Sequence, residues 1–262
     1  MKLPGGVWRE GRLHRDVAFR PMDGHLEMAV AEAAGALRDL PGRVSAALQA
    51  ALAEVGALGI NRELVDTLSV GDRQFLVSQL AGHLGLETAW LSATCRHCHE
   101  LFDFPLDYRA VPIKPAGEGY PFAEVTVSTG RIRVRVPTGA DQRAILSCPD
   151  EYGATRELAR RCIVGEPVAL TDEDITRIET ALEVLAPELA THVAASCPEC
   201  GSDNVLEFDP YYFLGQVGNE LFVDIHHLAA HYHWSESEIL GLPRWRRKKY
   251  LGLIDLARGM AT

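Results

Sequence analysis

The stretch Trp90-Leu-Ser-Ala-Thr-Cys95-Arg-His-Cys98-His-Glu-Leu-Phe-Asp-Phe104 contains a Cys-x-x-Cys turn between two short apolar runs. The same arrangement returns in His192-Val-Ala-Ala-Ser-Cys197-Pro-Glu-Cys200-Gly-Ser-Asp-Asn-Val-Leu-Glu-Phe208. Both turns are flanked by segments that read as short strands, so the chain is expected to contain one strand–turn–strand module twice. The two turns are about a hundred residues apart, which is too long for a loop and predicts a structured insertion between them.

Four cysteines in two such pairs are typical of a metal site. A Cys-x-x-Cys turn, called a knuckle below, presents two thiolates on one side, and two knuckles complete the tetrahedron that zinc prefers. Gly201 follows the second knuckle, where a positive φ lets the chain turn back. We therefore predict one structural zinc ion, with the four ligands Cys95, Cys98, Cys197 and Cys200. The alternatives are redox dithiols and two unrelated turns. Redox pairs usually lie at a strand-to-helix junction, which the sequence does not indicate here, and the duplicated flanking segments favour a common module over unrelated turns.

A site closed by four thiolates leaves no position for water or substrate, so this metal is not expected to be catalytic. His97 and His99 lie beside the first pair and could replace a cysteine, but they are more simply bystanders. Cys148 and Cys162 lack ligand spacing and are expected to be core thiols. The histidines between residues 226 and 233 include a spacing of four, yet the glutamate of His-Glu-x-x-His is missing, which speaks against a metalloprotease.

Composition describes an ordinary folded protein. The chain has 262 residues, of which 47% are hydrophobic and 24% are charged, with a formal net charge of -10. Such a chain can bury a core without disulfides, and its negative charge makes nonspecific capture of nucleic acid unfavourable. The first residues contain no apolar run long enough for a signal peptide or a membrane span, so a cytoplasmic protein without membrane contact is expected.

The expected fold class is α+β. Residues 1–88 should form an extended leader and a helical block, with the first helix over 23–40 ended by Pro41-Gly42 and the second over 43–55. Asn61 is expected to cap a short helix after these, and Ser69 to open the next one. Residues 89–137 should hold the first knuckle and a hairpin, and residues 138–190 a helical insertion. Residues 191–212 should hold the second knuckle, so that the knuckles share a zinc-ribbon-like β module. Residues 213–262 should form a C-terminal helical arm of three helices over 214–232, 235–240 and 243–256.

The arm carries the strongest signal for a partner. Its last helix begins Pro243-Arg-Trp-Arg-Arg-Lys-Lys-Tyr250, a cationic segment with aromatic residues, and tryptophan and arginine together often anchor interfaces. The candidate partner-binding residues are Trp234, Arg244, Trp245, Arg246, Arg247 and Tyr250. Because the rest of the chain is acidic, an acidic protein surface is favoured over nucleic acid as the target.

Four features resemble the T-even phage baseplate hub assembly chaperone family, which also occurs in gene clusters for contractile tails and contractile injection systems. The first feature is the pair of knuckles, with Phe102-Asp-Phe-Pro-Leu106 after the first of them. The other three are Phe19-Arg-Pro-Met-Asp-Gly24, Leu68-Ser-Val-Gly-Asp-Arg-Gln-Phe-Leu76, and Tyr232-His-Trp-Ser-Glu-Ser-Glu-Ile-Leu240 with Leu242-Pro-Arg244 and Arg246-Arg247. The resemblance implies a non-catalytic role in building or completing the central hub of a baseplate, with hub and other baseplate proteins as partners. It leaves open whether the protein departs after assembly or stays in the particle. A zinc-dependent nucleic-acid binder and a zinc hydrolase are the competing classes.

Overall fold

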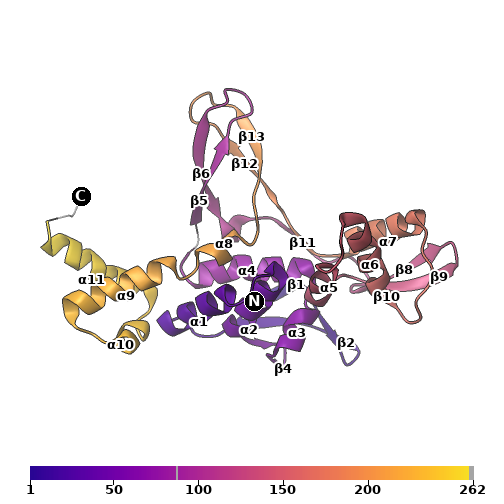
Figure 1. The fold of residues 1–262 in the computed structure, drawn as a ribbon, viewed down its shortest axis with the longest axis horizontal. Coiled ribbons are helices and arrows are strands. Elements are labelled where there is room, and N and C mark those ends of the chain that lie inside the picture. Colours follow the sequence, from indigo (N-terminus) through magenta and orange to yellow (C-terminus); the bar gives the residue numbers. More distant parts are fainter. Residues whose placement is uncertain (87, 260–262) are drawn as a thin grey trace.

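A computed structural model describes residues 1–86 and 88–259 as a central body with three projections (Figure 1). Two β-hairpins stand up from the body side by side and are called the stalk. A unit made from the residues between them, the insertion, lies at one end of the molecule. The C-terminal helices form the arm at the opposite end.

The body combines four helices with a four-stranded antiparallel sheet of order β1-β2-β3-β4. Its elements are β1 (Lys2–Arg9), β2 (Arg12–Phe19), α1 (Gly24–Gly35), α2 (Leu40–Ala51), β3 (Leu52–Val55), β4 (Leu58–Gly59), α3 (Arg62–Thr67) and α4 (Val70–His83). The expected helical block is therefore only part of the fold, because the leader pairs as a hairpin and residues 52–55 join its sheet. Leu48, Leu52, Leu76 and Leu80 are among the fully buried side chains of this core.

Capping side chains set the helix boundaries. Asn61 accepts a hydrogen bond from the amide of Leu64 at 2.8 Å, and the Ser69 hydroxyl accepts one from the amide of Asp72 at 3.2 Å. These sequence-based caps are confirmed. The role of Pro41 was predicted wrongly, because it lies in the first turn of α2 instead of ending the preceding helix. Proline fits a first turn since its missing N–H would have no partner there.

The stalk consists of two separate antiparallel hairpins, β5–β6 and β12–β13. Their bounds are β5 (Thr88–Thr94), β6 (Leu101–Asp107), β12 (His192–Ser196) and β13 (Asp203–Glu207), with a short 3-10 helix η1 (Tyr108–Ala110) after β6. Side chains alternate along each strand, so Phe102, Phe104 and Leu206 are buried between the hairpins while their neighbours face solvent. The predicted strand–turn–strand modules are confirmed.

The insertion is built from a three-stranded sheet of order β10-β9-β8 and three helices. Its elements are β8 (Phe122–Val127), β9 (Gly130–Arg135), α5 (Gly139–Ile145), α6 (Glu151–Cys162), β10 (Ile163–Val164) and α7 (Asp172–Leu185), while β7 (Ile113–Lys114) pairs with β11 (Glu188–Leu189) where the chain leaves and returns. Val134, Cys162 and Ile178 are fully buried in one core. The β8–β9 hairpin, which was expected to share a unit with the first knuckle, thus packs with the helices that follow it. It has no part in the core around the cysteines.

The arm contains α9 (Asn219–Tyr232), α10 (Glu236–Leu240) and α11 (Arg244–Ala257), preceded by α8 (Tyr212–Gln216). The single helix expected over 214–232 is interrupted at Gly218, whose φ is +89°. A Cβ at this position would lie 2.5 Å from the Cβ of Ala31, so only glycine lets α9 begin this close to α1. Within the described residues, no helix combines the length and apolar character needed to cross a bilayer.

Candidate metal centre

The two knuckles meet at the top of the stalk and bring four sulfur atoms together. The Sγ atoms of Cys95, Cys98, Cys197 and Cys200 all lie within 4.8 Å of one another. Cys95 and Cys200 are separated by 3.7 Å between their Sγ atoms, and so are Cys98 and Cys197. A tetrahedral ion with metal–sulfur bonds of about 2.3 Å requires sulfur–sulfur distances of about 3.8 Å, so the donor set fits zinc. All four are free thiols, as expected for ligands.

Both knuckles have the same backbone geometry. The amide of His99 donates to the carbonyl of Cys95 at 3.0 Å, and the amide of Gly201 donates to the carbonyl of Cys197 at 2.9 Å. The residue after each second cysteine has positive φ, +64° at His99 and +70° at Gly201. The expected turn at Gly201 is confirmed. His99 adopts the same left-handed conformation at a cost that glycine does not have.

Hydrogen bonds favour ionisation of two of the sulfurs, and the hydroxyl and amide of Ser202 lower the pKa of the Cys200 thiol. The amides of Cys98 and His97 lower the pKa of the Cys95 thiol to about 6. The amide of Glu100 lowers the pKa of the Cys98 thiol, but burial and the adjacent thiols together outweigh it and raise that pKa to about 12. Four thiols this close cannot all ionise alone, whereas a bound dication would favour the thiolate at every position.

Asn204 joins the two halves of the centre and was missed by the sequence analysis. Its side-chain amide lies 3.6 Å from the Sγ of Cys95, and its carbonyl oxygen accepts from the amide of Arg96 at 2.9 Å. The same side-chain amide donates to the carbonyl of Ser202 at 2.9 Å. One sequence signal could have found it: buried and exposed positions alternate along β13, and Asn204 falls on the buried side together with Leu206. Such outer partners orient the ligands of a metal site.

The histidines do not join this cluster. His97 and His99 are exposed beside the first knuckle, and His226, His227 and His231 are exposed on α9. In the residues the structure describes, the four cysteines form the sole group of three or more His, Cys, Asp or Glu side chains close enough to share an ion. Of the remaining thiols, Cys162 is buried in the insertion core and Cys148 is half-buried.

The candidate partner-binding residues divide into buried and exposed groups. Arg247 is fully buried and Arg244 nearly so, and both donate to the buried carboxylate of Glu27 on α1. The expectation that Arg244 and Arg247 contact a partner is therefore wrong, because positions 244 and 247 are three apart and lie on the inner face of α11. Trp245 and Arg246 are exposed.

Trp234 and Tyr250 are half-buried and belong to an aromatic cluster inside the arm. Their ring centroids are 4.9 Å apart with an edge-on orientation, and Trp234 also stacks on Tyr232 at 4.7 Å. The sequence analysis missed Glu27 on α1 as the counterpart of Arg244 and Arg247. The sequence offered one indication of this residue: Glu27 falls on the apolar side of α1, which is otherwise lined by Leu26 and Val30.

Searches of protein-family models, curated proteins and solved structures found no match to this chain.

Proposed function

We propose that the four-cysteine centre holds one structural Zn²⁺ ion. The observation that carries the proposal is the approach of four sulfur atoms from two distant segments to within 4.8 Å of one another. Each hairpin is only two-stranded, and a lone two-stranded hairpin is marginally stable in water. The apolar core between the hairpins is small, with Phe102, Phe104 and Leu206 as its buried members besides two of the cysteines.

The ion would be held by Cys95, Cys98, Cys197 and Cys200, and it would supply a rigid cross-link without activating water. The chain's own residues align the sulfurs: the knuckle amides donate to them, and Asn204 bridges the first knuckle to β13. Because β6 leads into the insertion and β12 leads out of it, fixing the stalk also fixes both ends of the insertion.

Metal analysis of the full chain purified without chelator tests this site, and one equivalent of zinc is expected. Cys95→Ser and Cys200→Ser should lose the metal and loosen the stalk, while Cys148→Ser, which alters a thiol outside the site, should retain it. Zinc near zero in a protein whose stalk amides remain protected from hydrogen exchange would refute the proposal.

For the biological role, we propose a non-enzymatic assembly chaperone or structural component of the baseplate hub of a contractile tail or injection system. The support is the resemblance of the four sequence features and the presence of exposed tryptophan and cations on the arm. In this proposal, the stalk and body hold the arm in position, and Trp245 and Arg246 contact a baseplate protein.

Co-purification from cells expressing the whole gene cluster tests the role. Trp245→Ala should abolish recovery of hub or baseplate proteins while zinc content and melting temperature stay unchanged. Trp8→Ala is a matched control, because Trp8 is an exposed tryptophan in the body. Recovery of the partners by the Trp245 variant would remove the arm from the mechanism, and finding the protein in purified particles would identify a permanent component.

A further inference from the structure

The outer face of α11 is apolar and cationic. Trp245 is 66% exposed, Leu253 is 47% exposed and Leu256 is 60% exposed. Lys249 lies on this face because positions 245, 249, 253 and 256 repeat at helical spacing. Arg246 lies at its edge, two turns before Leu253. Neither cation forms an ion pair in the described part of the chain, whereas the neighbouring Lys248 pairs with Glu220 and Asp224. The free charge on this face is therefore positive.

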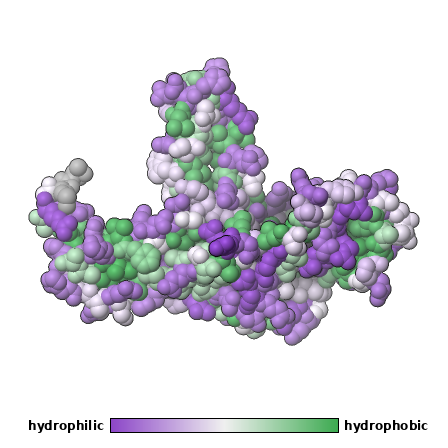
Figure 2. All heavy atoms as spheres, viewed as in Figure 1, coloured by the Kyte–Doolittle hydropathy of each residue, from purple (hydrophilic) through white to green (hydrophobic). Residues whose placement is uncertain are grey.

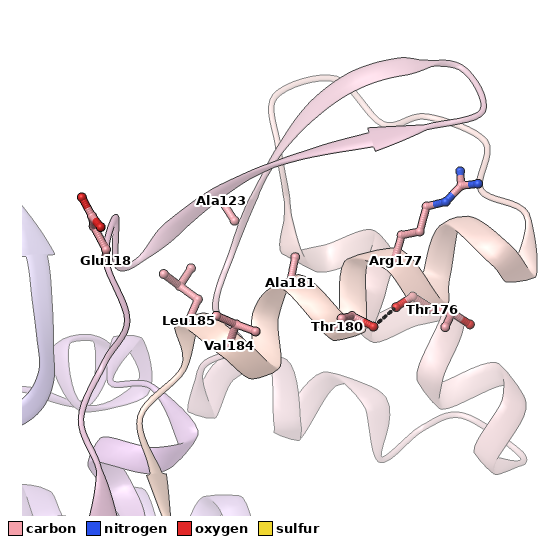
Figure 3. A pocket seen from close by; sticks show the side chains of 8 residues that line it. All are labelled: Glu118, Ala123, Thr176, Arg177, Thr180, Ala181, Val184 and Leu185. Atoms are coloured by element: carbon pink, nitrogen blue, oxygen red, sulfur yellow. Dashed lines mark hydrogen bonds between the residues drawn. The ribbon is translucent and has the colours of Figure 1, made fainter.

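At the opposite end of the molecule, the C-terminal half of α7 borders two hollows. One, of about 520 Å³, lies between α7 and β8, and the other, of about 900 Å³, lies between α7 and the start of α4. Val184 borders both hollows and is 73% exposed. Figure 3 shows Val184 and Leu185 at the end of α7, and Glu118 on the segment that leads into β8. A hollow beside this exposed apolar side chain can receive a protruding aromatic side chain, which would then pack against Val184.

The charge around these hollows is negative. Glu118, Glu179 and Glu183 are exposed at their walls, and within the described residues none of the three carboxylates has an ion-pair partner. The cations nearby are already engaged, since Lys114 pairs with Glu188 at 3.2 Å and Arg177 pairs with Glu173 at 2.6 Å. This acidic, partly apolar groove therefore complements the outer face of α11 in both charge and polarity.

The two surfaces cannot meet within one chain, because the arm and the insertion project from opposite ends of the body (Figure 1). Hydrophobic residues interspersed with hydrophilic ones cover both ends in the face drawn in Figure 2. We propose that the α11 face of one copy docks into the α7 groove of a second copy. This inference rests on the arm being a docking element, as in the proposed function, and it names another copy of the chain as a partner. Different patches meet in such a contact, so it is heterologous and adds copies head to tail.

Sedimentation velocity of the full zinc-loaded chain tests the contact. Association should grow with protein concentration up to about 100 µM and weaken as salt is raised, since the facing charges are exposed. Trp245→Ala and the pair Arg246→Glu with Lys249→Glu should weaken association about tenfold or more. Arg258→Glu reverses an exposed cation at the C-cap of α11, outside this face, and should change little. A chain that stays monomeric at every concentration, or that associates equally well after these changes, overturns the proposal.

Mixing two defective variants separates head-to-tail docking from other self-association. The Arg246→Glu, Lys249→Glu variant keeps an intact groove, and a Glu179→Lys, Glu183→Lys variant keeps an intact arm. Each should be monomeric alone, and their mixture should form a one-to-one pair that does not extend further. A mixture that remains monomeric refutes the docking of arm into groove. The proposed function requires only the arm. If docking between copies is refuted but hub proteins still co-purify with the groove variant, the proposed function therefore stands.

Discussion

Replacing Glu27 with glutamine should detach the arm from the body. The Glu27 carboxylate is 1% exposed, and it accepts from Arg244 at 2.8 Å and also from the fully buried Arg247. The variant leaves the Arg247 guanidinium buried without a counter-charge, and its Nε already lacks an acceptor. Removing one partner of a buried ion pair costs about 3 to 5 kcal/mol of unfolding free energy. For a chain of this size that is a fall of roughly 10 °C in Tm.

Chemical and thermal denaturation should be measured together with limited proteolysis of the arm and with zinc content. We expect faster cleavage between α10 and α11 and unchanged metal, because Glu27 lies near the base of the stalk, beside Thr88 and Trp90, whereas the cysteines lie in the turns at its far end. Glu32→Gln is the matched control, since Glu32 is an exposed carboxylate on the same helix. The double variant Glu27→Leu, Arg247→Met should recover most of the loss, because it removes the buried charges of Glu27 and Arg247 at similar volume, while Arg244 keeps its ion pair with Glu220.

A loss below about 1 kcal/mol for Glu27→Gln, equal to that of an ordinary surface substitution, would refute the buried contact between α1 and α11. A loss accompanied by zinc release would show that the arm and the stalk unfold as one unit, which contradicts their separate cores.

Three further outcomes test the centre and the insertion. Asn204→Ala should lower zinc affinity about tenfold to a hundredfold in a competition titration with a metal indicator, and equal affinity would exclude its bridging role. Gly201→Ala should destabilise its knuckle by about 1 kcal/mol in chemical denaturation, whereas His99→Gly should stabilise the other; the same sign for both would contradict the positive φ values. Asp141→Asn should cost about 1 to 3 kcal/mol at neutral pH. Burial raises the pKa of Asp141, but hydrogen bonds from Arg135 outweigh it and hold that pKa below 3.8, so this stabilisation is present above 3.8 and is lost as the pH falls. Denaturation curves at several pH values should show the gap between wild type and variant closing in acid, and a constant gap would refute the ion pair.

Local chemistry made parts of the fold predictable from sequence. Both knuckles and their flanking strands were found because each cysteine pair lies within four residues and the strand alternation spans only a few more. The caps at Asn61 and Ser69 were found for the same reason, since each side chain bonds an amide three residues away. Asn204 was missed because a buried amide has no sequence signature until its neighbours across the hairpin are known.

The sequence by itself determined the four cysteines of the candidate metal centre, the helix caps and the duplicated hairpin module, because each knuckle, cap and hairpin depends on residues that are close along the chain. The tertiary structure decided how the distant parts combine. It paired the leader into a sheet with residues 52–55, and it interrupted the arm at Gly218, where Ala31 leaves no room for a side chain. It also turned Arg247 from a candidate surface cation into the buried partner of Glu27, a residue 220 positions away. Periodicity shows that a helix has two faces, but only packing decides which of them is buried.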